Sequence, residues 1–211
     1  MAVRTTLFRS LGCVGLAVLV SGCGDVARLG RSPVQVATIL LQAAPGSNPS
    51  QFGNPLLSDV ETLLTTPAPC TPQAPCATFF NDLGQITMAL LLKNPGSVAS
   101  PNAPSLLNQV TFTRYRVEYT RTDGRNVQGV DVPFAFDSAV TFTVSAGGTS
   151  TNGFELVRNI AKREAPLLAL RTSGVIISTI AEVTFYGKDQ TGSDVTASGR
   201  MAVNFGNFAD Q

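Results

Sequence analysis

The stretch VIISTIAEVTFYGKDQTGSDVTASGRMAVNF (residues 175–205) decides the fold of this chain. Apolar and polar side chains alternate on both sides of its central segment KDQTGSD, residues 188–194. Such alternation is typical of β-strands with one face in a core and the other in water, and Asp and Gly are common turn residues. We therefore predict a terminal hairpin with strands at 175–187 and 195–205. The second strand directs these side chains to the core: Val195, Ala197, Met201, Val203 and Phe205.

The same period of two recurs through most of the chain after residue 76. Turn signals such as Asp123-Gly124 and Gly147-Gly148 separate the alternating segments. A first strand at 34–43 and one helical turn at 159–164, ended before Pro166, complete the pattern. About seven to nine strands without βαβ alternation predict an all-β fold, an antiparallel two-sheet sandwich. The further core faces are Ile86, Met88, Leu90 and Leu92; Val130, Val132, Phe134 and Phe136; and Val140, Phe142 and Val144.

Residues 110–119 contain a change of phase, because the apolar positions switch from even to odd numbers between Phe112 and Tyr115. A slip of one residue exchanges the two faces of a strand, so we predict a β-bulge near residues 113–114. Three charged side chains, Arg114, Arg116 and Glu118, then share the solvent face. They form either a polar binding stripe or, as we favour, a solvated face with cross-strand ion pairs.

A long loop is predicted at 44–76, where Pro, Gly, Ser and Asn are frequent, with a short helical or extended piece at 56–64. Its end, PAPCTPQAPCATFF (67–80), contains Cys70 and Cys76. In an oxidising, exported compartment these two cysteines are expected to form a disulfide. The enclosed loop is so short that the bond would pin the loop and not hold the whole domain together. A metal or redox pair is the alternative, which the spacing and the absence of His disfavour.

The first 23 residues read MAVRTTLFRSLGCVGLAVLVSGC. Arg4 and Arg9 make a basic segment, and residues 11–20 form an apolar stretch too short to span a bilayer permanently. The run Val20-Ser21-Gly22-Cys23 that follows resembles the lipobox of bacterial lipoproteins. This resemblance implies cleavage after residue 22, a diacylglyceryl group on the Cys23 sulfur, and anchoring in a membrane by two or more acyl chains. The alternative is an ordinary signal peptide before a secreted soluble domain.

The predicted organisation is therefore a lipoprotein signal peptide at 1–22, with its helix removed, the lipidated Cys23 and a tether at 23–33, and a β-sandwich domain at 34–211. By the same resemblance, Gly24 after the cysteine favours the outer over the inner membrane. The segment AEVTFYGKDQTGSDVTASG (181–199) resembles the last hairpin of Ig-like modules in bacterial surface proteins. Similarly, ITMALLLKNP (86–95) resembles the water-stress type of Ig-like domain. Both resemblances imply an Ig-like sandwich and carry no activity.

The composition excludes several kinds of chemistry. The chain has no His, so the commonest general base and metal ligand are missing, and its net charge of +1 gives no footprint for nucleic acid. Asp189 and Asp194 flank one turn, but two carboxylates are too few for Ca²⁺ and suit a hairpin turn. We expect no catalytic residue, cofactor or metal. A Ser–Lys dyad would need one of three lysines that we expect to be solvated: Lys93, Lys162 and Lys188.

We therefore expect a membrane-anchored, non-catalytic structural or binding module of the cell envelope. It would hold an envelope protein through an exposed sheet edge or through the long Pro-rich loop. The alternative is an envelope lipoprotein that binds a ligand or carbohydrate, or hydrolyses one. That alternative requires a pocket on which Tyr115, Tyr119 or Tyr186 converges with polar groups.

Overall fold

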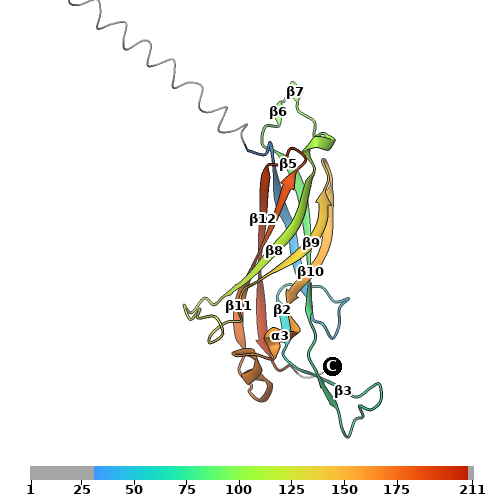
Figure 1. The fold of residues 1–211 in the computed structure, drawn as a ribbon, viewed down its shortest axis with the longest axis vertical. Coiled ribbons are helices and arrows are strands. Elements are labelled where there is room, and N and C mark those ends of the chain that lie inside the picture. Colours follow the sequence, from blue (N-terminus) through green and yellow to red (C-terminus); the bar gives the residue numbers. More distant parts are fainter. Residues whose placement is uncertain (1–30, 209–211) are drawn as a thin grey trace, which may run out of the picture.

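The terminal hairpin predicted from residues 175–205 is present as β11 (Ile177–Asp189) and β12 (Asp194–Gly206) in the computed structural model (Figure 1). The two strands pair antiparallel from Ile177 opposite Phe205 to Lys188 opposite Asp194. The odd-numbered side chains of β12 from Val195 to Phe205 are buried except at Gly199, as predicted. The structure describes residues 31–208, so the predicted signal peptide (1–22), Cys23 and the tether up to residue 30 lie outside the described residues.

The larger of two main sheets has five strands in the order β2-β12-β11-β8-β9. Its further members are β2 (Leu56–Asp59), β8 (Val110–Thr120) and β9 (Phe136–Val144). β2 runs parallel to β12, from Leu56 opposite Val203 to Asp59 opposite Gly206, so the predicted antiparallel pairing is wrong at this pair. The strand lies inside the predicted loop 44–76, where it has only four residues and follows a Pro-rich segment that masks its alternation.

The smaller main sheet has the order β1-β5-β10 and is antiparallel. Its strands are β1 (Val34–Ala44), β5 (Asp82–Leu92) and β10 (Thr149–Val157). Two short hairpins lie outside the main sheets, β3 (Thr62–Leu64) with β4 (Cys76–Thr78), and β6 (Gly96–Ser97) with β7 (Ser100–Pro101). The helical pieces are η1 (Leu106–Asn108), α3 (Asn159–Lys162) and η2 (Leu167–Thr172). Within residues 31–208, no helix is long and apolar enough to cross a membrane.

The buried faces of the two main sheets meet in one hydrophobic core. Phe185 of β11 packs edge-on against Phe154 of β10, with ring centroids 5.3 Å apart. The hydroxyl of Tyr115 donates to the carbonyl of Glu155 at 3.0 Å, and that of Tyr119 donates to the carbonyl of Leu156 at 2.5 Å. Two tyrosines of β8 therefore satisfy backbone acceptors of the opposite sheet, which fixes the position of one layer relative to the other.

The predicted bulge in β8 is present. The pairing of β8 with β9 shifts between Phe112 and Arg114, and the pairing with β11 shifts opposite them at Gly187. A Cβ atom on Gly187 would lie 2.4 Å from the carbonyl oxygen of Thr111, so only glycine fits against the bulge. The shift buries Phe112 and Tyr115 on the same face although their sequence parities differ.

The predicted strand at Val130, Val132, Phe134 and Phe136 is wrong except for its last residue, which begins β9, although Val132 is buried in the core as predicted. Val130 and Phe134 are 67% and 52% exposed. The backbone explains the difference, because Gly129 has φ +77 and Pro133 has no N–H to donate to a ladder. Residues 121–135 instead form a loop between β8 and β9. Spacing alone therefore gave a false strand signal here.

Candidate functional site

The charged stripe on β8 is a solvated face of the five-stranded sheet, as favoured from the sequence. Asp137 of β9 accepts from Arg114 at 3.1 Å and from Arg116 at 2.7 Å, and Arg116 also donates to Glu118 at 2.7 Å. Further along the face, Arg200 pairs with Glu182 at 2.7 Å. The charges on this outer face thus neutralise one another across neighbouring strands, which leaves no unbalanced stripe for a charged ligand.

The outer face of the three-stranded sheet is different, because it is almost free of charge. Its polar contacts are neutral, with Gln42 donating to Gln85 at 2.8 Å and the hydroxyls of Thr87 and Thr151 lying 2.9 Å apart. Solvent-exposed leucine side chains lie between these polar groups. Among the described residues of this face, only Glu155 is ionisable. The register places these side chains on it: Gln35, Ala37, Leu40 and Gln42; Leu83, Gln85, Thr87, Ala89 and Leu91; Thr149, Thr151 and Glu155.

This neutral face exposes Leu40, Leu83 and Leu91 by 48%, 38% and 45%, and Ile39 in the bulge of β1 by 60%. Single exposed apolar side chains are ordinary on protein surfaces, and these leucines are spaced along the face. What distinguishes the face is that they lie among neutral polar groups with Glu155 as the one ionisable side chain. The sequence signal was available, since residues 83–92 contain no Asp, Glu, Lys or Arg.

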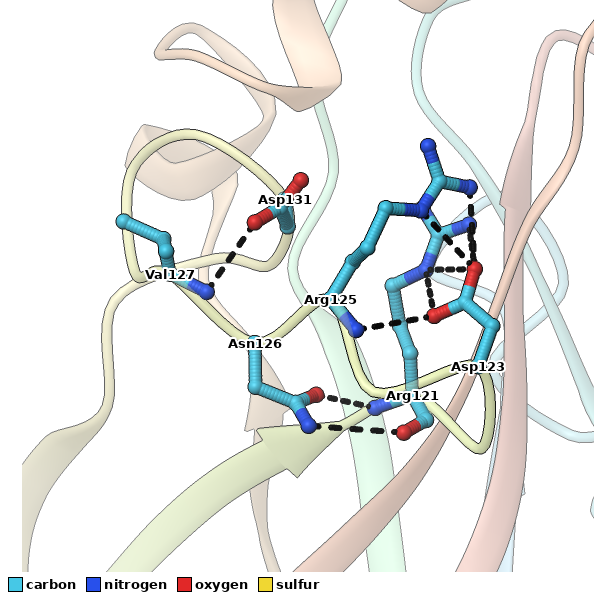
Figure 2. Close-up of polar contacts among 6 residues, drawn as sticks. All are labelled: Arg121, Asp123, Arg125, Asn126, Val127 and Asp131. Carbon is cyan, nitrogen blue, oxygen red and sulfur yellow. Dashed lines mark hydrogen bonds and ion pairs between the residues drawn. The ribbon is translucent and has the colours of Figure 1, made fainter.

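The loop 121–135 closes on itself through a second set of charges (Figure 2). Asp123 accepts from Arg121 at 2.6 Å and from Arg125 at 2.9 Å, and these hydrogen bonds hold the pKa of its carboxyl well below the usual range. The Asn126 side chain accepts from the backbone N–H of Arg121, and Asp131 accepts from that of Val127 at 3.1 Å. The loop is therefore ordered by its own polar groups, while Val130 and Phe134 stay in solvent.

A buried ion pair and its hydrogen bonds connect α3, β5 and β2. The Lys162 ammonium of α3 lies 2.9 Å from Asp82 at the start of β5, and both side chains are at most 1% exposed. Asp82 also accepts from the N–H of Gly46 and from the hydroxyl of Ser58 on β2. Burial raises the pKa of Asp82, although Lys162 and these donors oppose the shift.

The expectation that Lys162 would be solvated is wrong, because its partner Asp82 lies 80 positions away in sequence. Ser58, Asp82 and Lys162 resemble a catalytic grouping only in residue type. All three are buried, so a substrate has no access to the Ser58 hydroxyl. We interpret the cluster as structural, since its hydrogen bonds satisfy a charge that would otherwise be costly to bury.

The tyrosines that the ligand-binding alternative requires do not converge. Tyr115 and Tyr119 are in the core, and burial raises the pKa of both hydroxyls. Tyr186 lines an open hollow of about 470 Å³ on the five-stranded sheet, together with Thr111 and Lys188. The guanidinium of Arg114 covers the Tyr186 ring at 4.2 Å, so the ring face is already occupied.

The predicted Cys70–Cys76 disulfide is present and closes the loop between β3 and β4. The turn between β11 and β12 follows the turn interpretation and not the Ca²⁺ one. Asp189 accepts from the backbone N–H groups of Thr191 and Ser193, both at 2.9 Å, while Asp194 pairs with Lys188 at 2.7 Å. In residues 31–208, no group of three or more His, Cys, Asp or Glu side chains is placed to hold a metal ion.

Comparison with known proteins gives no relative: no protein family, no curated protein and no solved structure matches this chain.

Proposed function

We propose that this chain is an exported lipoprotein, anchored through Cys23 in the outer membrane, whose Ig-like sandwich is a non-catalytic binding module of the cell envelope. The observation that carries the proposal is the neutral outer face of the three-stranded sheet, set against the ion-paired face of the five-stranded sheet. The partner is an envelope protein that covers the neutral face.

The strand order supports the Ig-like assignment. Hairpins β8–β9 and β11–β12 lie within one sheet, whereas the chain crosses to the other sheet between β9 and β10 and returns before β11. Two packed sheets joined by such crossings are the arrangement of Ig-like domains, which host many unrelated functions. The fold therefore supports a binding module without naming its partner.

The energetics of desolvation favour the neutral face as the docking surface. A partner that covers the five-stranded sheet must dehydrate several ion pairs, which is costly unless each is matched. Covering the three-stranded sheet dehydrates amides, hydroxyls and leucines, and the centres of protein interfaces are depleted in charge in the same way. Thr87 and Thr151 already satisfy each other, so their burial leaves few unmatched hydroxyl groups.

The anchor is tested by growing cells that express the full chain with radiolabelled palmitate. We expect label on the protein and none on the Cys23→Ser variant, because the thiol is the attachment atom. A labelled Cys23→Ser protein contradicts lipidation at this residue. An unlabelled wild-type protein makes the chain a secreted domain.

The docking face is tested with a matched pair of threonines. Thr151 and Thr143 are both exposed, both lie on a sheet-edge strand, and each is 2.9 Å from one threonine of the next strand. We expect Thr151→Lys to abolish co-purification of a cross-linked envelope protein from detergent-solubilised membranes, because it puts a charge in the interface. Thr143→Lys, on the five-stranded sheet, should leave co-purification unchanged. Equal recovery with both variants contradicts the proposed face.

A further inference from the structure

A small lobe, residues 93–109, connects β5 to β8 and contains β6, β7 and η1. The N–H of Lys93 donates to the carbonyl of Pro33 at 3.0 Å, and Val34 pairs with Leu92. The lobe therefore lies beside the point where the chain enters the domain, at the end where Figure 1 shows β6 and β7. The hairpin β3–β4 and α3 lie at the opposite end.

The surface of the lobe is apolar and lacks carboxylates. Val98 is fully exposed, and Leu106 and Leu107 are 77% and 66% exposed. Residues 93–109 include no Asp or Glu and one basic residue, Lys93. The neighbouring turn 145–148 is also uncharged. Three large apolar side chains thus project at one end of the domain from a segment that has no acidic residue of its own.

The entry point of the chain is fixed relative to this lobe. Ser32 is 1% exposed, and the N–H of Val34 donates to its hydroxyl oxygen at 3.4 Å, so the chain is packed on the domain immediately before β1. Seven residues, 24–30, separate Cys23 from Arg31, so the anchor lies within about 30 Å of Ser32 even in a fully extended chain. The 13 residues of β12 span about 43 Å, which is longer than the reach of the segment between Cys23 and Ser32. A lipid on Cys23 therefore cannot extend beyond the opposite end of the domain.

We propose that the lobe 93–109 rests on the lipid bilayer, with Val98, Leu106 and Leu107 in its interfacial region. This proposal rests on the proposed anchoring through Cys23. Apolar side chains of surface-bound segments enter the boundary between headgroups and acyl chains, and nearby cationic groups favour anionic lipids. Arg31 and Lys93 provide such groups at this end. The contact orients the domain with its opposite end away from the membrane.

The chain contains no Trp, so one introduced Trp reports on one position. The full, lipidated chain carrying Leu107→Trp is placed in vesicles of phosphatidylethanolamine and phosphatidylglycerol, with or without brominated phosphatidylcholine. We expect bromine to reduce the emission about twofold, because interfacial side chains lie about 5–10 Å into the headgroup boundary. The control is Val130→Trp in the loop 121–135, which follows the end of β8 away from the lobe and where the native side chain is 67% exposed. Its emission should not change.

Flotation of the vesicles comes first, and it separates failure of the anchor from failure of the contact. Protein that does not float overturns the proposed anchor and the lobe contact with it. Protein that floats while Leu107→Trp is not quenched overturns the contact alone. If the Trp emission of Leu107→Trp is blue-shifted but not quenched, protein covers the lobe, and the proposed membrane contact is overturned. A shift that depends on protein concentration identifies the covering protein as a second copy of the chain. Equal quenching of both variants shows a domain lying along the membrane and also contradicts the proposal.

Discussion

The two ends of the domain use charged side chains in opposite ways. At the end with α3 and the loop 121–135, Arg, Lys, Asp and Glu cross-link the connections: Lys162 pairs with Asp82, Arg171 with Glu61, and Arg121 and Arg125 with Asp123. At the end where the chain enters, the lobe 93–109 has a single charged residue and is held mainly by backbone and amide hydrogen bonds. One end is ordered by paired charge, whereas at the other the lobe presents uncharged groups and the nearby Lys188–Asp194 pair is exposed.

The difference indicates that connecting loops in this fold are not equivalent. A charge orders a connection when its partner is fixed, either by another element, as Asp82 of β5 is for Lys162 of α3, or within the same loop, as Asp123 is for Arg125. The lobe lacks such partners, and its apolar side chains remain exposed. The cross-linked end contributes to stability, whereas the entry end is free to contribute to binding.

The largest effect that tests this comparison is expected for the Lys162→Met variant. Removing one partner of a buried pair leaves Asp82 uncompensated, so we expect a loss of about 3–5 kcal/mol in the free energy of unfolding. The matched control is Lys188→Met at the entry end, where the pair with Asp194 is exposed, and the loss should stay below about 1 kcal/mol. Urea denaturation measures both. Equal losses of unfolding free energy in the two variants would show that ion pairs contribute equally to stability at both ends.

Two leucines near helical turns provide the second test. Leu167 in η2 is fully buried, whereas Leu107 in η1 is 66% exposed. We expect Leu167→Ala to lower the free energy of unfolding by about 2–5 kcal/mol, because it opens a cavity. Leu107→Ala should change it by no more than about 0.5 kcal/mol, as at other exposed sites. Thermal unfolding in the absence of membranes would refute the assignment of roles if Leu107→Ala were the more damaging change.

The third test concerns the disulfide, which lies in the peripheral hairpin β3–β4. We expect Cys70→Ser with Cys76→Ser to accelerate proteolytic cleavage within residues 65–75 while the midpoint of global unfolding changes little. The bond closes a short loop, and its entropic effect is confined to that loop. Limited proteolysis followed by mass spectrometry locates the cleavage. A large fall in the unfolding midpoint would instead make the hairpin part of the cooperative core.

The smallest effect is expected at Asp123. Hydrogen bonds from Arg121 and Arg125 lower the pKa of Asp123 below the ordinary value of 3.8. A carboxyl with a lowered pKa stabilises the fold above its unfolded pKa, and this contribution is lost as the pH falls through the folded pKa. The carboxyl should therefore remain ionised somewhat below pH 3.8. NMR titration of the side-chain carbon measures the midpoint, and Arg125→Ala should raise it. An unchanged midpoint in that variant would mean that Arg125 does not hold the carboxylate.

Local sequence patterns predicted the features that depend on neighbours. The alternation in β11 and β12 predicted the hairpin, the parity change after Phe112 predicted the bulge, and two cysteines in an exported domain predicted the disulfide. Features that depend on distant partners were missed or left open between a helix and a strand. β2 is defined by its parallel pairing with β12, and Lys162 is buried because the fold brings Asp82 to it.

The candidate surfaces follow the same rule. The solvated stripe of Arg114, Arg116 and Glu118 could be predicted because its members lie on one strand. Residues 83–92 show part of the neutral outer face, but the whole face could not be predicted, because it is assembled from β1, β5 and β10, which are spread over residues 34–157. The order of the strands had to be known before the shared absence of charge could be seen.

The direction of β1 has a mechanical consequence. Its first residue, Val34, lies at the entry end, and the strand runs from there toward the opposite end while it pairs with β5 along its length (Figure 1). Under the proposed anchoring, a pull between membrane and partner acts on Val34 along the axis of the strand. The β1–β5 hydrogen bonds are then loaded in shear and share the force, instead of opening one after another from the end. The side chain of Thr38 adds a link to the carbonyl of Ser198 on β12 at 2.8 Å, so the same load also reaches the second sheet.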